Sequence, residues 1–209
     1  MILNFIDNKK CCGCGACKEI CPRKAIKMNE DSEGFLQPEL IKELCIDCGI
    51  CDNVCPIKNT EKTVHNVILP LAAINKNINI LNKSSSGGIF SVIAEYVINN
   101  GGIVYGAAFD KNLKLSHIGV ENTNELERLR GSKYLQSDSF NCFPSIKEQL
   151  RNGKLVYFVG TGCQVGALKL YLRKEYNNLI TSDLICHGVP SHKLFDTFVS
   201  AYEKKQIEK

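Results

Sequence analysis

Apolar runs of strand length alternate with segments of helical periodicity through the last two thirds of the chain. Short apolar runs predict strands at 67–74, 103–109, 115–120, 155–160 and 179–186. Apolar residues at helical spacing predict helices at 89–98, 123–130, 145–151, from the 161–164 turn to 176, and at 192–205. The runs at 155–160 and 179–186 are nearly continuous, which is typical of strands buried on both faces. Strands that lead through glycine-rich turns into helices predict an α/β domain.

The first sixty residues follow a different pattern. Two short strands are predicted at 25–28 and 34–38 around a polar turn, with a helical turn over 39–44. The polar stretch 58–63 reads as a linker. The sequence therefore predicts two domains, 1–60 and 61–209.

Two copies of one cysteine pattern, C-x2-C-x2-C-x3-C-P, lie in the first domain. The eight cysteines are Cys11, Cys14, Cys17 and Cys21, then Cys45, Cys48, Cys51 and Cys55. In this bacterial ferredoxin run three close thiolates hold one 4Fe-4S cluster and the fourth binds the other cluster. The pattern predicts one cluster on Cys11, Cys14, Cys17 and Cys55, and a second on Cys45, Cys48, Cys51 and Cys21.

Disulfides and zinc are the alternatives for closely spaced cysteines. Neither predicts four matched spacings twice, each followed by a proline. Cys12 falls outside the repeat, and we interpret it as a packed bystander.

Composition and charge narrow the function classes. The chain has 209 residues, 44% of them hydrophobic, and a formal charge of +4 without a basic stripe interleaved with aromatics, which argues against nucleic acid. Glycine or asparagine interrupts the apolar stretches before the ~20 residues of a membrane span, and the apolar start is too short for a signal peptide. Cysteines arranged for clusters belong in a reducing compartment, so a cytoplasmic location is expected.

A serine- and glycine-rich turn precedes the helix predicted at 89–98. Ser84, Ser85, Ser86, Gly87 and Gly88 offer hydroxyls and bare amides where a helix begins, which suits an anion. The turn matches neither the dinucleotide-binding G-x-G-x-x-G pattern nor the P-loop. A serine-capped helix start is the alternative.

Three further cysteines, Cys142, Cys163 and Cys186, lie in the second domain. Cys163 and Cys186 each follow an apolar strand, where open α/β sheets place their ligand crevice. They could pack as small apolar residues, form a redox dithiol, or help to bind another cluster. His187 could donate a proton or bind a cofactor there, or be structural; His65, His117 and His192 look incidental.

Four segments resemble the coenzyme F-420 hydrogenase/dehydrogenase beta-subunit family. They are SSSGGIFS (84–91), LRGSKYLQSD (129–138), GKLVYFVGTGCQVGALK (153–169) and DLICHGVPS (183–191). The resemblance implies an α+β ferredoxin-like two-cluster domain followed by an α/β flavin-binding-type domain. It also implies FAD, and electron passage between clusters and a two-electron partner, which is coenzyme F-420 in archaea and a chlorophyll derivative for plant relatives.

The resemblance also implies a set of site residues. By position, 84–88, 131–134, 161–164 and 186–189 would line the flavin site, with Ser132, Thr161, Gly162 and Gln164 as binding residues. Lys133 would place a positive charge near the ring; Lys133, Cys163, Cys186 and His187 are the catalytic candidates. Gly162 stands where the family often has proline. Family members usually continue past the last segment, so the second domain is expected to be incomplete at Lys209.

The leading hypothesis is an iron–sulfur flavoprotein oxidoreductase that delivers an electron pair to a small-molecule acceptor. The rival is a non-catalytic electron carrier or subunit of the ferredoxin type. A third possibility is a relative that lost its activity and acts within carbohydrate biosynthesis. Each of the first two implies a redox partner protein or a soluble electron carrier.

Overall fold

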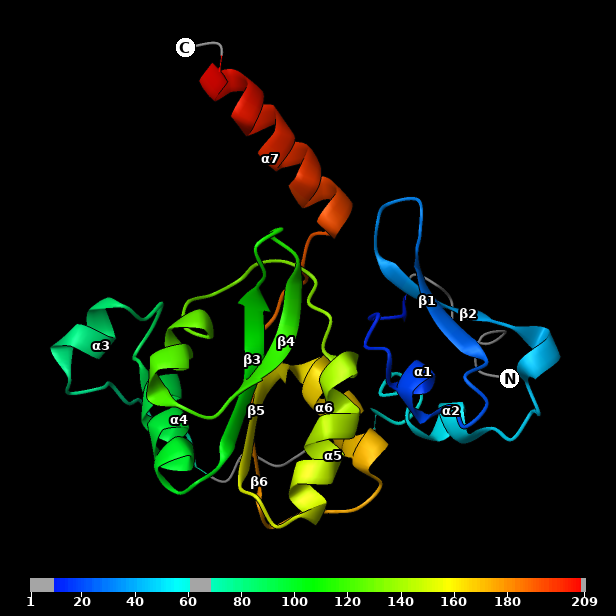
Figure 1. Cartoon of the computed structure of the whole chain (residues 1–209), viewed down its shortest axis with the longest axis horizontal. Coiled ribbons are helices and arrows are strands. Elements are labelled where there is room, and N and C mark those ends of the chain that lie inside the picture. Colours follow the sequence, from blue (N-terminus) through cyan, green and yellow to red (C-terminus); the bar gives the residue numbers. More distant parts are fainter. Residues whose placement is uncertain (1–9, 61–68, 208–209) are drawn as a thin grey trace.

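The chain builds two sheets that lie side by side (Figure 1). The computed structural model describes residues 10–60 and 69–207. The smaller sheet pairs β1 (Ile26–Glu30) with β2 (Leu36–Leu40) in antiparallel register. The helices α1 (Ala16–Ile20) and α2 (Ile50–Asn53) and the 3-10 helix η3 (Lys42–Leu44) flank it. The two strands confirm the predicted hairpin, although β2 begins and ends two residues later than expected and β1 continues to Glu30.

The larger sheet has four strands in the order β4-β3-β5-β6. The hairpin of β3 (Ile103–Phe109) and β4 (Leu115–Val120) is antiparallel and matches the predicted ranges. β5 (Val156–Thr161) lies parallel to β3, and β6 (Leu179–Leu184) lies parallel to β5. The carboxyl ends of three strands therefore meet at one edge of the sheet.

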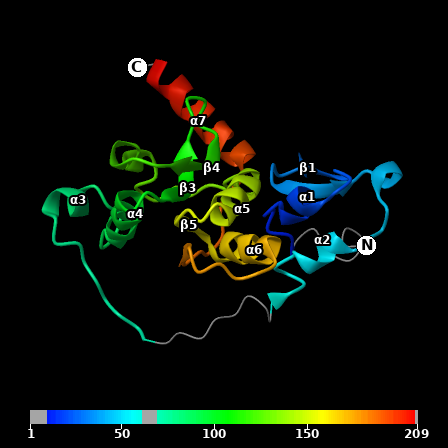
Figure 2. The same cartoon turned by 60° about the horizontal axis from the view of Figure 1, so that its bottom comes forward.

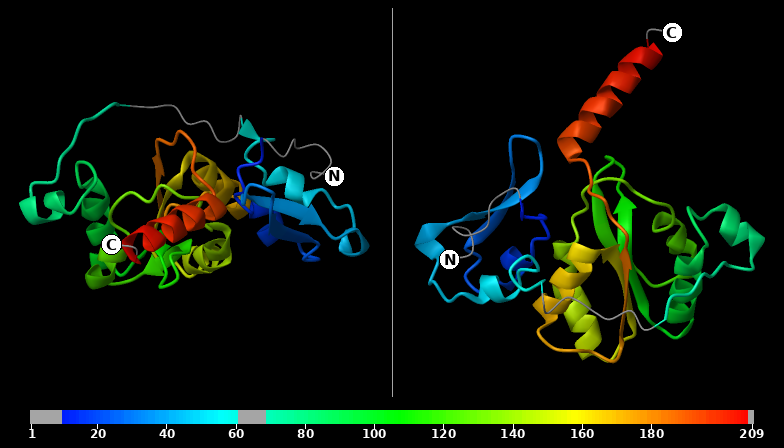
Figure 3. Two further views of the ribbon diagram at one scale, coloured as in Figure 1. Left: turned by 90° about the horizontal axis from the view of Figure 1, so that it is seen from above. Right: turned by 180° about the vertical axis from the view of Figure 1, so that it is seen from behind.

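Helices cover both faces of this sheet, as seen from behind in Figure 3. α4 (Ile89–Asn99) packs on one face, and α5 (Phe143–Arg151) and α6 (Gly162–Leu172) pack on the other. Alternate strand residues supply the two cores because successive side chains point to opposite faces. Val104 and Tyr157 pack in the α4 core, whereas Tyr105 and Phe158 pack in the α5–α6 core. The predicted α/β layering is confirmed.

One apolar core joins the two sheets. Ala16 of α1 and Val54 are fully buried in the same cluster as Phe140, Phe143 and Leu168. Both views in Figures 1 and 2 place α1 and α2 beside α6. The small sheet region is thus packed against the larger one through buried side chains and not only through the chain connection.

Several predicted elements are wrong. Residues 69–74 form no strand, and Leu69, Leu71 and Ile74 are largely exposed because the described sheet offers them no partner; 67 and 68 lie outside the described residues. The short helix α3 (Ile78–Asn82), capped by Asn77, was not predicted. β6 is partly exposed, not buried, because it is the edge strand of this sheet, and it ends at Leu184.

Two of the predicted helices differ from the observed ones in their ends or their type. α6 ends at Leu172 because Arg173 takes the left-handed conformation at φ 62°, so the helix does not reach Tyr176. The segment 123–130 is a 3-10 helix, η5 (Thr123–Arg128), with its cap at Asn122, and a second 3-10 turn, η6 (Phe140–Cys142), precedes α5.

The last helix, α7 (His192–Ile207), confirms its prediction and extends away from both sheets (Figure 1). Phe195 anchors its start by stacking on Phe109 at 6.0 Å between ring centroids. Within the described ranges, no helix combines the length and apolarity that crossing a membrane requires.

Candidate electron-transfer site

The two cysteine repeats fold into matching loops. Gly15 and Gly49 precede α1 and α2 with φ of 65° and 68°, a left-handed conformation that favours glycine. Each loop therefore turns the chain directly into a short helix that carries the next cysteine of its repeat. The two cysteine repeats are therefore alike in backbone conformation as well as in sequence.

One small cavity collects four cysteines from both repeats. Cys45, Cys48 and Cys51 line it together with Cys21, the last cysteine of the first repeat. Ile26, Leu40 and Ile50 supply much of the apolar wall. This is the set predicted for the second cluster, with its crossed fourth member.

Three of the remaining repeat cysteines lie close to one another. Burial raises the pKa of Cys17 to about 12, with further contributions from Cys11, Cys51 and Cys55. Burial likewise raises the pKa of Cys11, and the nearby Cys55 adds to the effect. Cys11, Cys17 and Cys55 are thus neighbours, as the first predicted set requires.

Among the described side chains, no three cysteine, histidine or acidic groups converge as the ligands of a single metal ion do. Thiolates that each bind a different iron of a cluster stand farther apart than ligands of one ion. The assignment of individual cysteines to clusters stays a prediction.

A cavity of about 950 Å³ opens at the carboxyl edge of the large sheet. Gly106 of β3, Gly160 of β5 and Leu184 of β6 lie on its wall. Cys11 and Cys14 of the first repeat line the same cavity. A ligand held there would lie directly beside thiols predicted to bind a cluster.

The cavity gathers most of the site residues predicted from the sequence. Those on its wall are Ser84, Ser85, Ser86, Gly87, Gly88, Ser132, Lys133, Thr161, Cys163, Gln164, Cys186, Gly188 and Val189. In the described chain Gly162, Tyr134 and His187 lie off this wall, and all three are solvent exposed. Tyr134 turns outward with 80% of its surface exposed, so its predicted contact is not supported.

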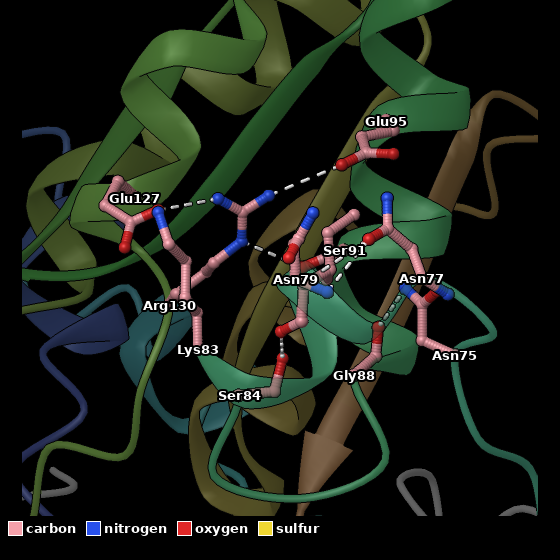
Figure 4. Close-up of polar contacts among 11 residues, drawn as sticks. Asn75, Asn77, Asn79, Lys83, Ser84, Gly88, Ser91, Glu95, Glu127 and Arg130 are labelled. Atoms are coloured by element: carbon pink, nitrogen blue, oxygen red, sulfur yellow. Dashed lines mark hydrogen bonds and ion pairs between the residues drawn. The ribbon is translucent and has the colours of Figure 1, made fainter.

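Hydrogen bonds from Asn75 fix the serine-glycine loop on the cavity wall. The Asn75 amide donates to the Gly87 carbonyl at 2.7 Å, and its side chain donates to Gly88 at 3.3 Å (Figure 4). Gly88 begins α4 with φ 71°, and a Cβ at Gly87 would lie 2.5 Å from the Ala73 carbonyl oxygen. The positive end of α4 therefore faces the cavity, a geometry that binds anions.

Arg130 connects this loop region to the following segment. Its guanidinium donates to Ser91 at 2.9 Å and pairs with Glu95 and Glu127 at 3.3 and 2.8 Å (Figure 4). Lys83 lies 3.6 Å from the same Glu127 carboxylate. The network fixes residues 130–133 against the first turns of α4.

Lys133 lies half-buried on the cavity wall. Its ammonium donates to the Arg130 carbonyl at 2.6 Å and to the Gly131 carbonyl at 3.2 Å. Burial lowers the pKa of Lys133. These two carbonyls hold the amino group close to the backbone of its own turn, where it can face a ligand in the cavity.

Sequence reasoning missed a buried polar network behind the cavity. His117 is 6% exposed, lies within hydrogen-bonding distance of the Val159 carbonyl at 2.9 Å and of Ser137 at 3.3 Å, and stacks on Phe158. The Gln164 amide donates to the Ser137 hydroxyl at 2.8 Å. Burial lowers the pKa of His117 to about 4.

His117, to which the sequence assigns no role, is therefore a neutral residue of the cavity wall. The sequence does contain a signal for the burial of His117. Side chains alternate between the two faces along β4, so His117 lies on the same face as the buried Leu115.

Gln136 connects the small sheet region with the cavity wall. Its side-chain oxygen accepts from the Leu36 backbone amide at 3.1 Å, and its backbone amide donates to the Pro190 carbonyl at 3.1 Å. A Cβ at Gly13, whose φ is 64°, would lie 2.5 Å from the Gln136 side chain. The first cysteine loop thus packs closely on the second region.

Comparison with known proteins shows which class of domain the first region resembles. Residues 10–59 match the family model of the 4Fe-4S dicluster domain, which spans all eight repeat cysteines. This part of the chain is an iron–sulfur electron-transfer domain, joined here to an α/β sheet. No curated protein matches the chain.

A solved structure shares part of the fold. A chain of the xenon-derivatised F420-reducing NiFe hydrogenase complex from Methanosarcina barkeri is 24% identical with a TM-score of 0.50. The likeness covers 60% of this chain and 46% of that chain, so this chain spans less than half the length of its neighbour there. At this identity the comparison speaks to the fold alone.

Proposed function

We propose that this chain passes electrons between two 4Fe-4S clusters and a flavin, most simply FAD, bound in the large cavity. The observation that carries the proposal is the shared wall: Cys11 and Cys14 line the same cavity as Ser84–Gly88, Lys133 and Gln164. Cluster and flavin would then be neighbours, as electron transfer between them requires. The family resemblance of the four segments supports the same assignment.

The residues present fit a flavin. The cavity volume of about 950 Å³ suits a large cofactor. The start of α4 offers bare amides and the Ser84–Ser86 hydroxyls for a pyrophosphate. Lys133 supplies a positive charge, which stabilises the anionic ring of a reduced flavin.

A bound flavin would exchange single electrons with the clusters and an electron pair with an acceptor. The protein residues would bind and orient it. The Ser132 backbone amide donates to the Ser85 hydroxyl on the cavity wall, and Gln164 is fixed by Ser137 and the Thr161 amide. The buried, neutral His117 closes the far wall. None of these side chains needs to carry a proton to the substrate.

Cys11, Cys14, Cys17 and Cys55 would hold the cluster beside the flavin, and Cys21, Cys45, Cys48 and Cys51 the outer one. The proposed acceptor is a hydride acceptor such as coenzyme F-420, and a redox partner protein would exchange electrons at the outer cluster. Because thiolate ligands need reducing surroundings, we propose a cytoplasmic location.

Anaerobic purification followed by iron determination and absorbance spectroscopy tests the proposal. About eight irons per chain, four per cluster, together with a flavin spectrum after incubation with FAD are expected. Eight irons with no FAD binding by titration would contradict the flavin assignment and favour a ferredoxin-type carrier. Loss of iron would instead overturn the cluster assignment.

A further inference from the structure

The loop of the second cysteine repeat is open to solvent. Cys48 is exposed, and the neighbouring Leu44 and Ile46 are 40% and 61% exposed. No described atom lies within 4 Å of a Cβ built on Gly49. The adjacent 3-10 helix η3 lies at the end of the molecule far from the large sheet (Figures 1 and 3). A partner can therefore reach this repeat without displacing any described part of the chain.

This surface, which we call the outer face, consists of Arg23 and residues 44–50. Its centre is apolar: Ile46 and Ile50 line the cavity that collects the four cysteines of the predicted outer cluster. Leu44 and Ile46 extend this apolar wall to the surface of the molecule. Exposed apolar side chains that cluster in this way mark an interaction site.

Free charges of both signs flank the apolar centre. Arg23 and Asp47 are exposed and line the same cavity as Ile46. Neither of these two charged groups forms a salt bridge or a side-chain hydrogen bond with any residue that the structure describes. Lys42 and Glu43 of η3 add a second pair of opposite sign nearby.

The backbone fixes the place of Asp47 beside Ile46. Asp47 has φ 51°, a left-handed conformation that aspartate tolerates better than most residues. Its backbone amide donates to the Cys45 sulfur at 3.4 Å. The carboxylate therefore starts from a defined position at the rim of the apolar centre.

An apolar centre with a free charge of each sign is complementary to a second copy of itself related by a two-fold axis. A partner that carried charge of one sign only would meet like charge beside Ile46. We propose that the outer face is a self-association surface. Two copies of the chain form a symmetric dimer with Ile46 near the axis, and Arg23 of each copy faces Asp47 of the other.

In such a dimer the redox partner of the outer cluster is the outer cluster of the second copy, and in this respect the inference rests on the proposed function. One cluster is oxidised by one electron as the other is reduced, so no further reagent is consumed. The two proposed flavin cavities would thereby share electrons. An interface of this small size is at the weak end of specific contacts, so the dimer should dissociate on dilution.

Sedimentation velocity on a dilution series of the anaerobically purified, iron-loaded full-length protein tests the interface. The wild type should be a dimer that dissociates on dilution. Arg23→Asp and Asp47→Lys should each raise the dimer dissociation constant roughly tenfold, because each places like charges opposite one another. Lys24 also has φ 51°, so a lysine fits the conformation of residue 47. The double variant Arg23→Asp/Asp47→Lys restores opposite charges and should return the constant close to the wild-type value.

Lys111→Asp is the matched control for Arg23→Asp. Lys111 is an exposed cation in the turn between β3 and β4, so its reversal should leave the dissociation constant unchanged. Ile46→Ser removes the apolar centre and should also weaken the dimer, which provides a second measurement where a charge variant loses iron. Iron is determined on every sample.

Three results would overturn the proposal. One is a protein with about eight irons that stays monomeric at every concentration. Another is a dimer that none of Arg23→Asp, Asp47→Lys and Ile46→Ser weakens, because it would use a different face. The last is a double charge variant as weak as the single ones. Iron content and FAD binding are measured separately, so a failure of the proposed function shows there and a failure of the dimer shows in the sedimentation.

Discussion

Gly15 lies flat against the ring of Phe140: a Cβ built on Gly15 would stand 2.1 Å from the Phe140 Cδ1 atom. Phe140 itself is 3% exposed and belongs to the core that joins the two regions. Gly49, the equivalent residue of the second repeat, has nearly the same φ, but no described atom lies within 4 Å of its Cβ position. One repeat is thus docked on the α/β region, and the other is free of it at this position.

Gly15→Ala should therefore destabilise the protein more than Gly49→Ala. Both changes place alanine at positive φ, which costs about 1 kcal/mol. Only Gly15→Ala also forces Phe140 from its place, for about 1–3 kcal/mol more. Anaerobic thermal unfolding would measure the difference, with iron content as the check that both variants are loaded. Equal melting temperatures for the two variants would contradict this docking role.

Substitution of Cys21 should remove the cluster of the second repeat. Cys21 shares a cavity with Cys45, Cys48 and Cys51, although it stands in the first repeat. Cys21→Ala and Cys48→Ala should each leave about four irons and the same residual EPR signal. Cys14→Ala should leave the complementary signal. If Cys21→Ala instead matched Cys14→Ala, the crossed arrangement would be wrong.

The sequence predicted the parts of the site whose signals are local, and it missed those that depend on packing. The cysteine spacing, the β3–β4 hairpin and the turn at 84–88 are each contained in a few adjacent residues. By contrast, the exposure of 69–74 and the edge position of β6 depend on which strands pair. The contacts of Gly13 with Gln136 and of Gly15 with Phe140 arise only when two distant regions meet, so no local pattern announces them.

Acid should destabilise the protein through His117. The pKa of the buried His117 is about 4, against 6.5 for a free side chain. The unfolded chain then binds more protons than the folded one between these values, so stability falls as the pH drops through that window. The loss should reach about 1 kcal/mol between pH 7.5 and 5.5.

Urea unfolding of wild type and His117→Gln at these two pH values would measure this effect. The variant should be less stable at pH 7.5, because it loses the stacking on Phe158, but its stability should depend less on pH. The exposed His187 provides the control, and His187→Gln should keep the wild-type pH dependence. An unchanged pH dependence in His117→Gln would exclude His117 as the source.

Lys133 should raise the reduction potential of a flavin bound in the cavity. Its half-buried ammonium is fixed by the Arg130 and Gly131 carbonyls on the cavity wall, so its charge is less screened than that of a surface lysine. Lys133→Met should lower the two-electron potential of bound FAD by on the order of 30 mV, since reduction adds negative charge. Lys133→Arg keeps the charge and should stay close to wild type. Spectroelectrochemical titration of the FAD-loaded variants measures both shifts. An equal fall in both variants would mean that Lys133 acts through its two carbonyl contacts and not through its charge, because Lys133→Arg keeps the charge but changes the donor geometry.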